Sequence, residues 1–159
     1  MPTLAVIWRA AGLLFATGVE SIVEVLPPLK SRPAPGAPPW VRGLFCHRDQ
    51  LIPLVDVTRL LGGTPSGDRM VNRVLVVRRS LGSESNDWPV GLWVEGVLEL
   101  ERIDFESAGN HPGFETDAGR FLGPVAQTRW GQVQRVDAQD IFTPEEAAVL
   151  SERLAESAA

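Results

Sequence analysis

The chain has 159 residues, of which 44% are hydrophobic and 22% are charged. These fractions are ordinary for a globular protein and exclude a largely disordered chain. The 15 Lys and Arg residues are outnumbered by 20 Asp and Glu residues, and no basic run is present, so we expect no nucleic-acid partner. The single cysteine, Cys46, excludes an internal disulfide bond and a zinc site built on several cysteines.

The N-terminal segment from Met1 to Phe15 is apolar, but Trp8-Arg9 interrupts it and no small-residue cleavage site follows. No stretch reaches the roughly 18 consecutive apolar residues that a membrane-spanning helix needs. We therefore expect a cytoplasmic protein that does not insert into the membrane.

Short strands are expected from the first residues onward. Thr3 to Arg9 is rich in β-branched and aromatic residues, Ala11-Gly12 offers a turn, and Leu13 to Ala16 reads as the returning strand. Val19 to Leu26 fits both a helical and an alternating pattern, so we expect one helical turn that runs into a short strand.

The clearest local signal is a hairpin that follows a proline-rich segment. Pro27 to Pro39 holds six prolines and is expected to be an extended loop packed on the domain. Val41 to Phe45 and Gln50 to Val57 are apolar runs separated by His47-Arg48-Asp49, which is hairpin spacing with Asp49 suited to a left-handed turn. Thr58 to Leu61 then predicts one helical turn.

The second half continues the pattern of short strands. Asn72 to Arg78 predicts a buried strand, and Pro89 to Leu100 a longer one that bends at Gly96, with Glu95 and Glu99 in solvent. Two further strands and a terminal helix are expected at Phe121 to Val125, at Gln132 to Val136, and from Thr143 onward. About nine or ten short strands with frequent turns favour an all-β architecture of barrels.

No catalytic or metal-binding grouping is evident. Adjacent residues on a strand point to opposite faces, so Cys46 and His47 do not form a nucleophile and its base. His47 and His111 lack metal-ligand spacing, and Asp56 is expected to cap the following helical turn. We expect no cofactor and no metal; a catalytic or small-molecule-binding barrel would rest only on Cys46, His47 and Asp56.

The chain contains five tryptophans and no tyrosine. Trp40 and Trp93 sit in apolar runs and are expected in the core. Trp8, Trp88 and Trp130 lie near turns, where an indole is often half-exposed and available to partners.

A family resemblance is carried by the segment around the hairpin. Ala37 to Phe45 (Ala-Pro-Pro-Trp-Val-Arg-Gly-Leu-Phe), then Arg48, then Leu51 to Gly62 (Leu-Ile-Pro-Leu-Val-Asp-Val-Thr-Arg-Leu-Leu-Gly) resemble the CheW family of coupling proteins of bacterial chemosensory arrays. Further matching segments follow in order, so that the resemblance covers about residues 4 to 150: Val19 to Leu26, Arg73 to Val77, Val90 to Val97, Phe121 to Val125 and Asp137 to Leu150.

This resemblance implies an all-β fold of two small five-stranded SH3-like β-barrels packed on a shared hydrophobic interface, with a short C-terminal α-helix. The CheW-like domain is expected over residues 3–150. One barrel is expected at about 18–80, and the other at about 3–17 with 81–142. The helix and tail are expected at 143–159.

The resemblance also implies a non-enzymatic adaptor with two partners: the regulatory domain of a CheA-type histidine kinase, and the cytoplasmic tip of a methyl-accepting chemoreceptor. The protein would join membrane-receptor arrays through these partners. By position in the family pattern, the partner-binding residues are Val19, Ile22, Glu24, Gly43 and Arg48. Glycine allows another backbone to approach closely, arginine can pair bidentately with a carboxylate, and an apolar side chain can bury area.

The chain departs from the family pattern at the hairpin, where Cys46-His47-Arg48-Asp49 replaces Asn-Leu-Arg-Gly, and at Arg135 in a usually apolar strand. In these departures the chain resembles CheW-like proteins of alternative, surface-sensing (Wsp-like) pathways that control cyclic-di-GMP or pili. Flagellar chemotaxis is the competing interpretation. They also motivate an alternative function, a decoy or inhibitor that binds the kinase regulatory domain without receptor coupling.

Overall fold

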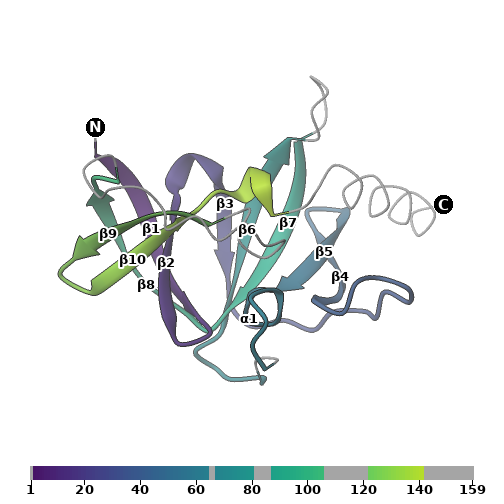
Figure 1. The fold of residues 1–159 in the computed structure, drawn as a ribbon. Helices are drawn as coiled ribbons and strands as arrows, with labels where there is room; N and C mark the ends of the chain where they lie inside the picture. The colour runs from purple at the N-terminus through teal and green to yellow at the C-terminus, as the bar shows by residue number, and fades with distance from the viewer. Residues whose placement is uncertain (1, 65–66, 81–86, 106–121, 142–159) are drawn as a thin grey trace.

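The computed structural model describes residues 2–64, 67–80, 87–105 and 122–141, which form two five-stranded sheets lying side by side (Figure 1). The first sheet has the order β8-β1-β2-β10-β9 and consists of β1 (Thr3–Ala10), β2 (Leu13–Gly18), β8 (Gly96–Ile103), β9 (Leu122–Thr128) and β10 (Gly131–Val136). The second has the order β3-β6-β7-β5-β4 and consists of β3 (Ile22–Leu26), β4 (Val41–His47), β5 (Gln50–Asp56), β6 (Arg73–Ser80) and β7 (Asp87–Val94).

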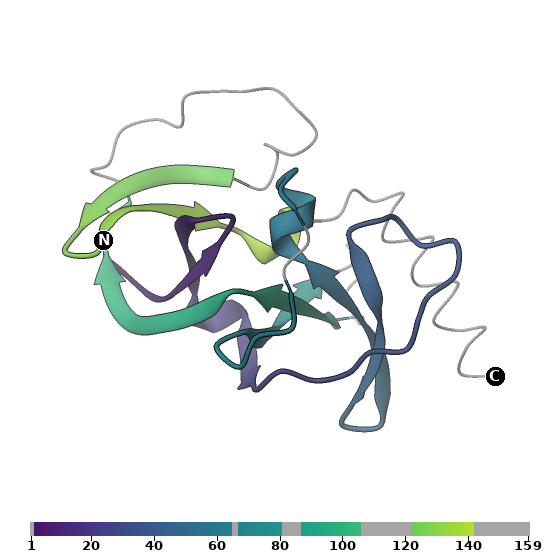
Figure 2. The same cartoon turned by 90° about the horizontal axis from the view of Figure 1, so that it is seen from below.

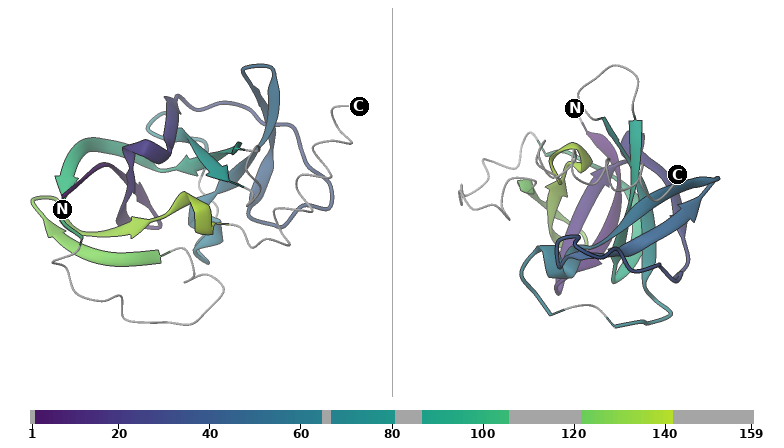
Figure 3. Two further views of the ribbon diagram at one scale, coloured as in Figure 1. Left: turned by 90° about the horizontal axis from the view of Figure 1, so that it is seen from above. Right: turned by 90° about the vertical axis from the view of Figure 1, so that its right-hand side faces the viewer.

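Each sheet is mixed, because β10 pairs with β2 and β5 pairs with β7 in parallel, while the remaining pairs are antiparallel. Three short helices complete the described part: η1 (Val19–Ser21), α1 (Val57–Leu60) and η4 (Ala138–Asp140). Figures 2 and 3 show that the β4–β5 hairpin and the β9–β10 pair lie at opposite ends of the molecule. None of the helices in these ranges is long and apolar enough to span a membrane.

Both faces of the central strands are buried, and strand alternation divides their side chains between different cores. In β1, Ala5 and Ile7 point into the first sheet, whereas Val6, Trp8 and Ala10 point toward the second sheet. The same alternation in β6 places one set of valines and leucines between the sheets and the other set inside the second sheet. This explains why these strands read in the sequence as nearly continuous apolar runs.

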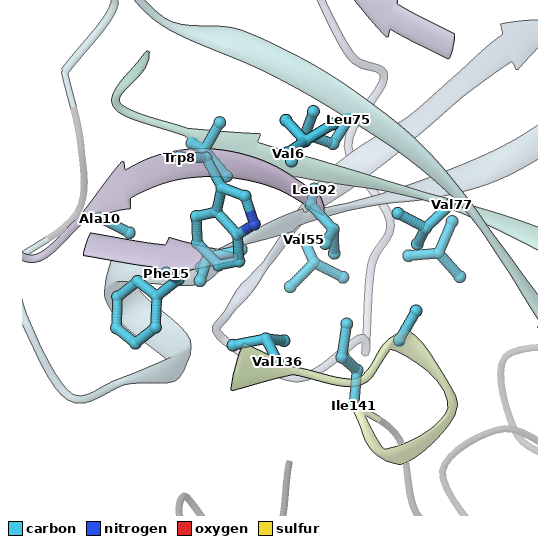
Figure 4. Close-up of a cluster of buried hydrophobic side chains, with 14 of the residues drawn as sticks. Val6, Trp8, Ala10, Phe15, Val55, Leu75, Val77, Leu92, Val136 and Ile141 are labelled. Carbon is cyan, nitrogen blue, oxygen red and sulfur yellow. The ribbon is translucent and has the colours of Figure 1, made fainter. Parts of the chain in front are cut away.

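The largest cluster lies between the two sheets and receives side chains from both (Figure 4). Trp8 stacks on Phe15 with ring centroids 4.9 Å apart, and the Trp8 Nε1–H donates to the buried Thr17 Oγ1 at 3.1 Å. Leu92 and Val55 face them from the second sheet. The predicted shared hydrophobic interface is confirmed.

Some of the predictions for the tryptophans are confirmed and one is wrong. Trp8 is fully buried, so its predicted half-exposure is wrong: the strand continues past it to Ala10, and its side chain faces the second sheet rather than the turn. Trp93 is buried and Trp40 packs against the core, as expected, and Trp130 is 39% exposed. The prediction for Trp88 concerns a side chain outside the described ones.

The division of the chain between the sheets differs from the predicted one. The second sheet is a continuous segment from β3 to β7, nested between the β1–β2 pair and the last three strands of the first sheet. Strand β7 pairs with β6 and β5, so assigning residues 81–142 to the same half as 3–17 is wrong for β7. The chain crosses to the first sheet at the predicted bend, Gly96, where φ is +157°.

The crossover is fixed by Glu95, which was expected in solvent. Its carboxylate accepts hydrogen bonds from the Thr58 hydroxyl at 2.6 Å and from the Ala11 backbone N–H at 2.9 Å. Its own backbone N–H donates to the Arg9 carbonyl at 2.8 Å. The prediction that both side chains lie in solvent is therefore wrong for Glu95, whereas the side chain of Glu99 is 45% exposed, as expected.

The sheets are curled but are not closed barrels, which corrects the expected SH3-like closure. Within the described ranges, no backbone ladder joins the edge strands β8 and β9 of the first sheet, or β3 and β4 of the second. We call these two gaps the first seam and the second seam. The outer edge of β4 is instead paired with Arg32, which exchanges two backbone hydrogen bonds of 2.7 Å with Leu44. The predicted C-terminal helix lies outside the described residues.

We predict that Trp8→Ala lowers the free energy of unfolding by about 3–5 kcal/mol, because it leaves a large cavity between the sheets. Trp130→Ala is the matched control and should change it by less than about 0.5 kcal/mol, because that indole is on the surface. Urea denaturation followed by circular dichroism measures both. Equal losses in the two variants would contradict the placement of Trp8 in the shared core.

Candidate partner-binding surface

The β4–β5 hairpin ends in a tight turn without glycine. His47 pairs with Gln50, and the two residues between them, Arg48 and Asp49, have φ of +50° and +62°. Positive φ at both central residues is the requirement of a type I′ turn, whose twist matches that of the flanking strands. The prediction of a left-handed Asp49 is confirmed, and the same conformation at Arg48 directs this arginine into solvent, where its side chain is 70% exposed.

Three side chains meet across the second seam, from opposite edges of the sheet. The His47 Nε2–H donates to the Glu24 Oε2 at 2.8 Å, and an Arg48 terminal nitrogen lies 3.6 Å from the same oxygen. Glu24 comes from β3, whereas His47 ends β4. We call Glu24, His47 and Arg48 the seam cluster.

The electrostatics of the seam cluster favour an ionised Glu24. The hydrogen bond from His47 lowers the pKa of the Glu24 carboxyl, burial opposes this, and the charges of Arg48 and His47 lower the pKa further. His47 is the most enclosed of the three, with its side chain 10% exposed against 40% for Glu24. The cluster therefore presents the Arg48 guanidinium to solvent beside an ionised carboxylate that is hydrogen-bonded to His47.

Of the five predicted site residues, the structure brings together Glu24 and Arg48. Val19 and Ile22 are partly buried and pack against the core between the sheets. Their apolar area is thus largely used within the chain.

Gly43 has a structural role that the sequence did not reveal. It is buried with φ of +154°, and a Cβ atom there would collide with the carbonyl oxygen of Arg32. The close backbone approach that we expected a partner to make is made by the proline-rich segment of the same chain. The expected packing of that segment on the domain is confirmed.

The residues considered for chemistry have other roles. The Asp56 carboxylate accepts from the Arg59 backbone N–H at 3.2 Å, which confirms the predicted helix cap, and it lies 3.6 Å from Arg42. Cys46 is exposed, and His47 is held by Glu24. No group of three or more potential metal ligands occurs among the residues that the structure places.

Sequence reasoning missed His47 as part of this surface. Its partner Glu24 is 23 positions away in sequence and on the opposite edge of the sheet, so no local spacing indicates the contact. The departure at Arg135 also has a local explanation, because its guanidinium lies 5.7 Å from the centre of the Phe105 ring.

The chain thus has two sheets around a shared core and charged side chains exposed at a seam. The pattern of the CheW-like domain matches residues 5–146, and the chain belongs to the CheW-like domain family. Members of this class are scaffolds in chemotaxis signal transduction rather than enzymes.

Two similar proteins support this assignment. Protein PilI of Pseudomonas aeruginosa is 30% identical over 100 residues, which cover 63% of this chain and 53% of PilI, so the chain spans about half the length of this curated relative. The crystal structure of the scaffolding protein TtCheW from Thermoanaerobacter tengcongensis superposes with a TM-score of 0.77 at 24% identity, covering 89% of this chain and 93% of TtCheW. The second likeness shows that the fold is shared.

We predict that Gly43→Ala destabilises the protein by about 2–4 kcal/mol, because the added methyl group displaces Arg32 and the backbone conformation is strained. Gly67→Ala is the control, since a Cβ atom there meets nothing within 4 Å. Thermal unfolding of both variants gives the comparison. A Gly43→Ala protein as stable as the control would show that Arg32 does not pack in this way.

The seam cluster predicts an acid-sensitive contribution to stability. Because the pKa of Glu24 is lower in the folded protein, its carboxylate stabilises the fold above about pH 4.5, and this contribution is lost as the pH falls through the folded-state value. The stability difference between wild type and Glu24→Gln should therefore shrink between pH 6 and pH 3 in urea titrations. Glu20→Gln, on the neighbouring η1, serves as the control, and a difference independent of pH would contradict the pair.

Proposed function

We propose that this protein is an adaptor that joins the regulatory domain of a CheA-type histidine kinase to the cytoplasmic tip of a methyl-accepting chemoreceptor. The observation that carries the proposal is the seam cluster, in which two residues matching the family's partner-binding positions, Glu24 and Arg48, lie together at the surface. Membership of the CheW-like family supports a binding role without catalysis.

The shape of the molecule suits two simultaneous contacts. The seam cluster lies at the second sheet, and the β9–β10 turn lies at the far end of the molecule (Figure 1). This turn presents the half-exposed Trp130 beside Arg129, whose guanidinium is 5.1 Å from the indole centre. Aromatic and arginine side chains are enriched among residues that dominate binding energy. Partners bound at the two ends need not compete, as coupling requires.

The same proposal places the protein in the cytoplasm, held at membrane arrays through its partners.

The hairpin Cys46-His47-Arg48-Asp49 favours an alternative, surface-sensing pathway over flagellar chemotaxis, because this turn differs from the family pattern at a contact position. The altered turn equally motivates the decoy function, in which kinase binding persists and receptor binding is lost.

The test is titration of the purified protein against the kinase regulatory domain and, separately, against the receptor tip. Binding to both supports the adaptor, and binding to the kinase domain alone supports the decoy. Binding to neither overturns the proposed function while leaving the fold assignment in place.

We predict that Arg48→Glu weakens binding to one partner by about 2–3 kcal/mol, because the partner's carboxylate loses the arginine that pairs with it and is repelled by the new negative charge. Arg69→Glu, which makes the same charge change at an exposed loop position, is the matched control. Calorimetric titration of both variants gives the difference. Equal affinities in wild type and Arg48→Glu for both partners would remove Arg48 from the surface.

A further inference from the structure

We infer that His47 is a positioning residue that sets the charge of the seam cluster, so that Arg48 binds an acidic group of the partner more tightly when the imidazole is protonated. This inference rests on the proposed function, because it assigns partner chemistry and regulation to the same surface. It concerns a residue that the family pattern does not predict, since leucine stands at this position there.

The geometry gives His47 control over Glu24. The imidazole is nearly enclosed at the end of β4, and its Nε2 lies 2.8 Å from the Glu24 Oε2. Arg48 lies 3.6 Å from the same oxygen, longer than a hydrogen bond, and its side chain is 70% exposed. His47 therefore holds the carboxylate, whereas the donors of Arg48 remain directed to solvent.

The charges of the neighbouring groups determine whether protonation of His47 raises or lowers the affinity for an acidic partner group. Among the residues that the structure describes, the charged groups next to His47 are Glu24 from β3, which contacts it, and Arg48 and Asp49, which follow it in the turn; the preceding residue, Cys46, is an exposed thiol. With a neutral imidazole these three charges sum to −1, which opposes an approaching carboxylate. Protonation of His47 brings the sum to zero and compensates Glu24 directly.

The exposed groups favour an acidic rather than a basic partner group. The Glu24 Oε2 already accepts a hydrogen bond from His47 and lies beside Arg48, so this oxygen is less available to a cation than the Arg48 donors are to an anion. A carboxylate can approach Arg48 from solvent and pair with it bidentately. Affinity should therefore be higher when the His47 imidazole carries a proton than when it is neutral.

The experiment measures the dissociation constants of the complexes with the kinase regulatory domain and with the receptor tip at pH 6 and pH 8. For the partner that depends on Arg48, wild type should bind about three- to tenfold more tightly at pH 6. His47→Gln, which keeps an N–H donor but cannot be protonated, should lose most of this ratio. His111→Gln removes the only other histidine and should keep it.

A ratio unchanged by His47→Gln would overturn the inference and leave the adaptor function standing. A reversed ratio would overturn it too, because it would show a basic partner group at Glu24. Binding of neither partner at either pH would remove both proposals.

A second measurement tests the pair in the free protein. Titration of the Glu24 carboxyl by nuclear magnetic resonance should show a higher pKa in His47→Ala than in wild type, because the hydrogen bond that lowers it is gone. An unchanged pKa would show that His47 does not hold Glu24, and the inference would fail whatever the partners do.

Discussion

Neither five-stranded sheet can bury its apolar side chains alone. In β1 and β6, alternate residues point to opposite faces and both faces are apolar, so each sheet needs one core inside its own curl and another against its neighbour. The stacked Trp8 and Phe15 contribute the largest fully buried rings to the shared core. The packing of the two sheets, and hence the positions of all their edges, depends on this one interface.

Within the described residues, the two seams are crossed by side-chain contacts, and the outer edge of β4 is covered by its backbone pairing with Arg32. At the first seam, Arg129 contacts Glu99 at 2.9 Å and Glu101 at 3.2 Å; at the second, Glu24 contacts His47. Unpaired strand edges invite association with other chains, and charged side chains restrict which chains can approach. In a scaffold this is an advantage, because such bridges leave charged groups at the surface for recognition.

Local elements could be predicted from the sequence because their signals are local. The hairpin turn at Asp49 and the cap at Asp56 depend on residues within three positions. The sequence could not show that the residues around Glu95 carry the chain from one sheet to the other, or that His47 meets Glu24, because both contacts join distant segments. Trp8 was misplaced for the same reason: nearness to a turn said nothing of the sheet that covers it.

The nesting of the second sheet within the first has a consequence for synthesis on the ribosome. All strands of the second sheet emerge before β8, so that sheet can assemble while β1 and β2 still lack their neighbours β8 and β10. The faces of β1 and β2 that point into the first sheet must wait until Val136 has left the exit tunnel, because their partners lie on the last three strands. During that interval the nascent chain exposes an unsatisfied two-stranded apolar ribbon, the state in which misassembly with another chain is most favourable.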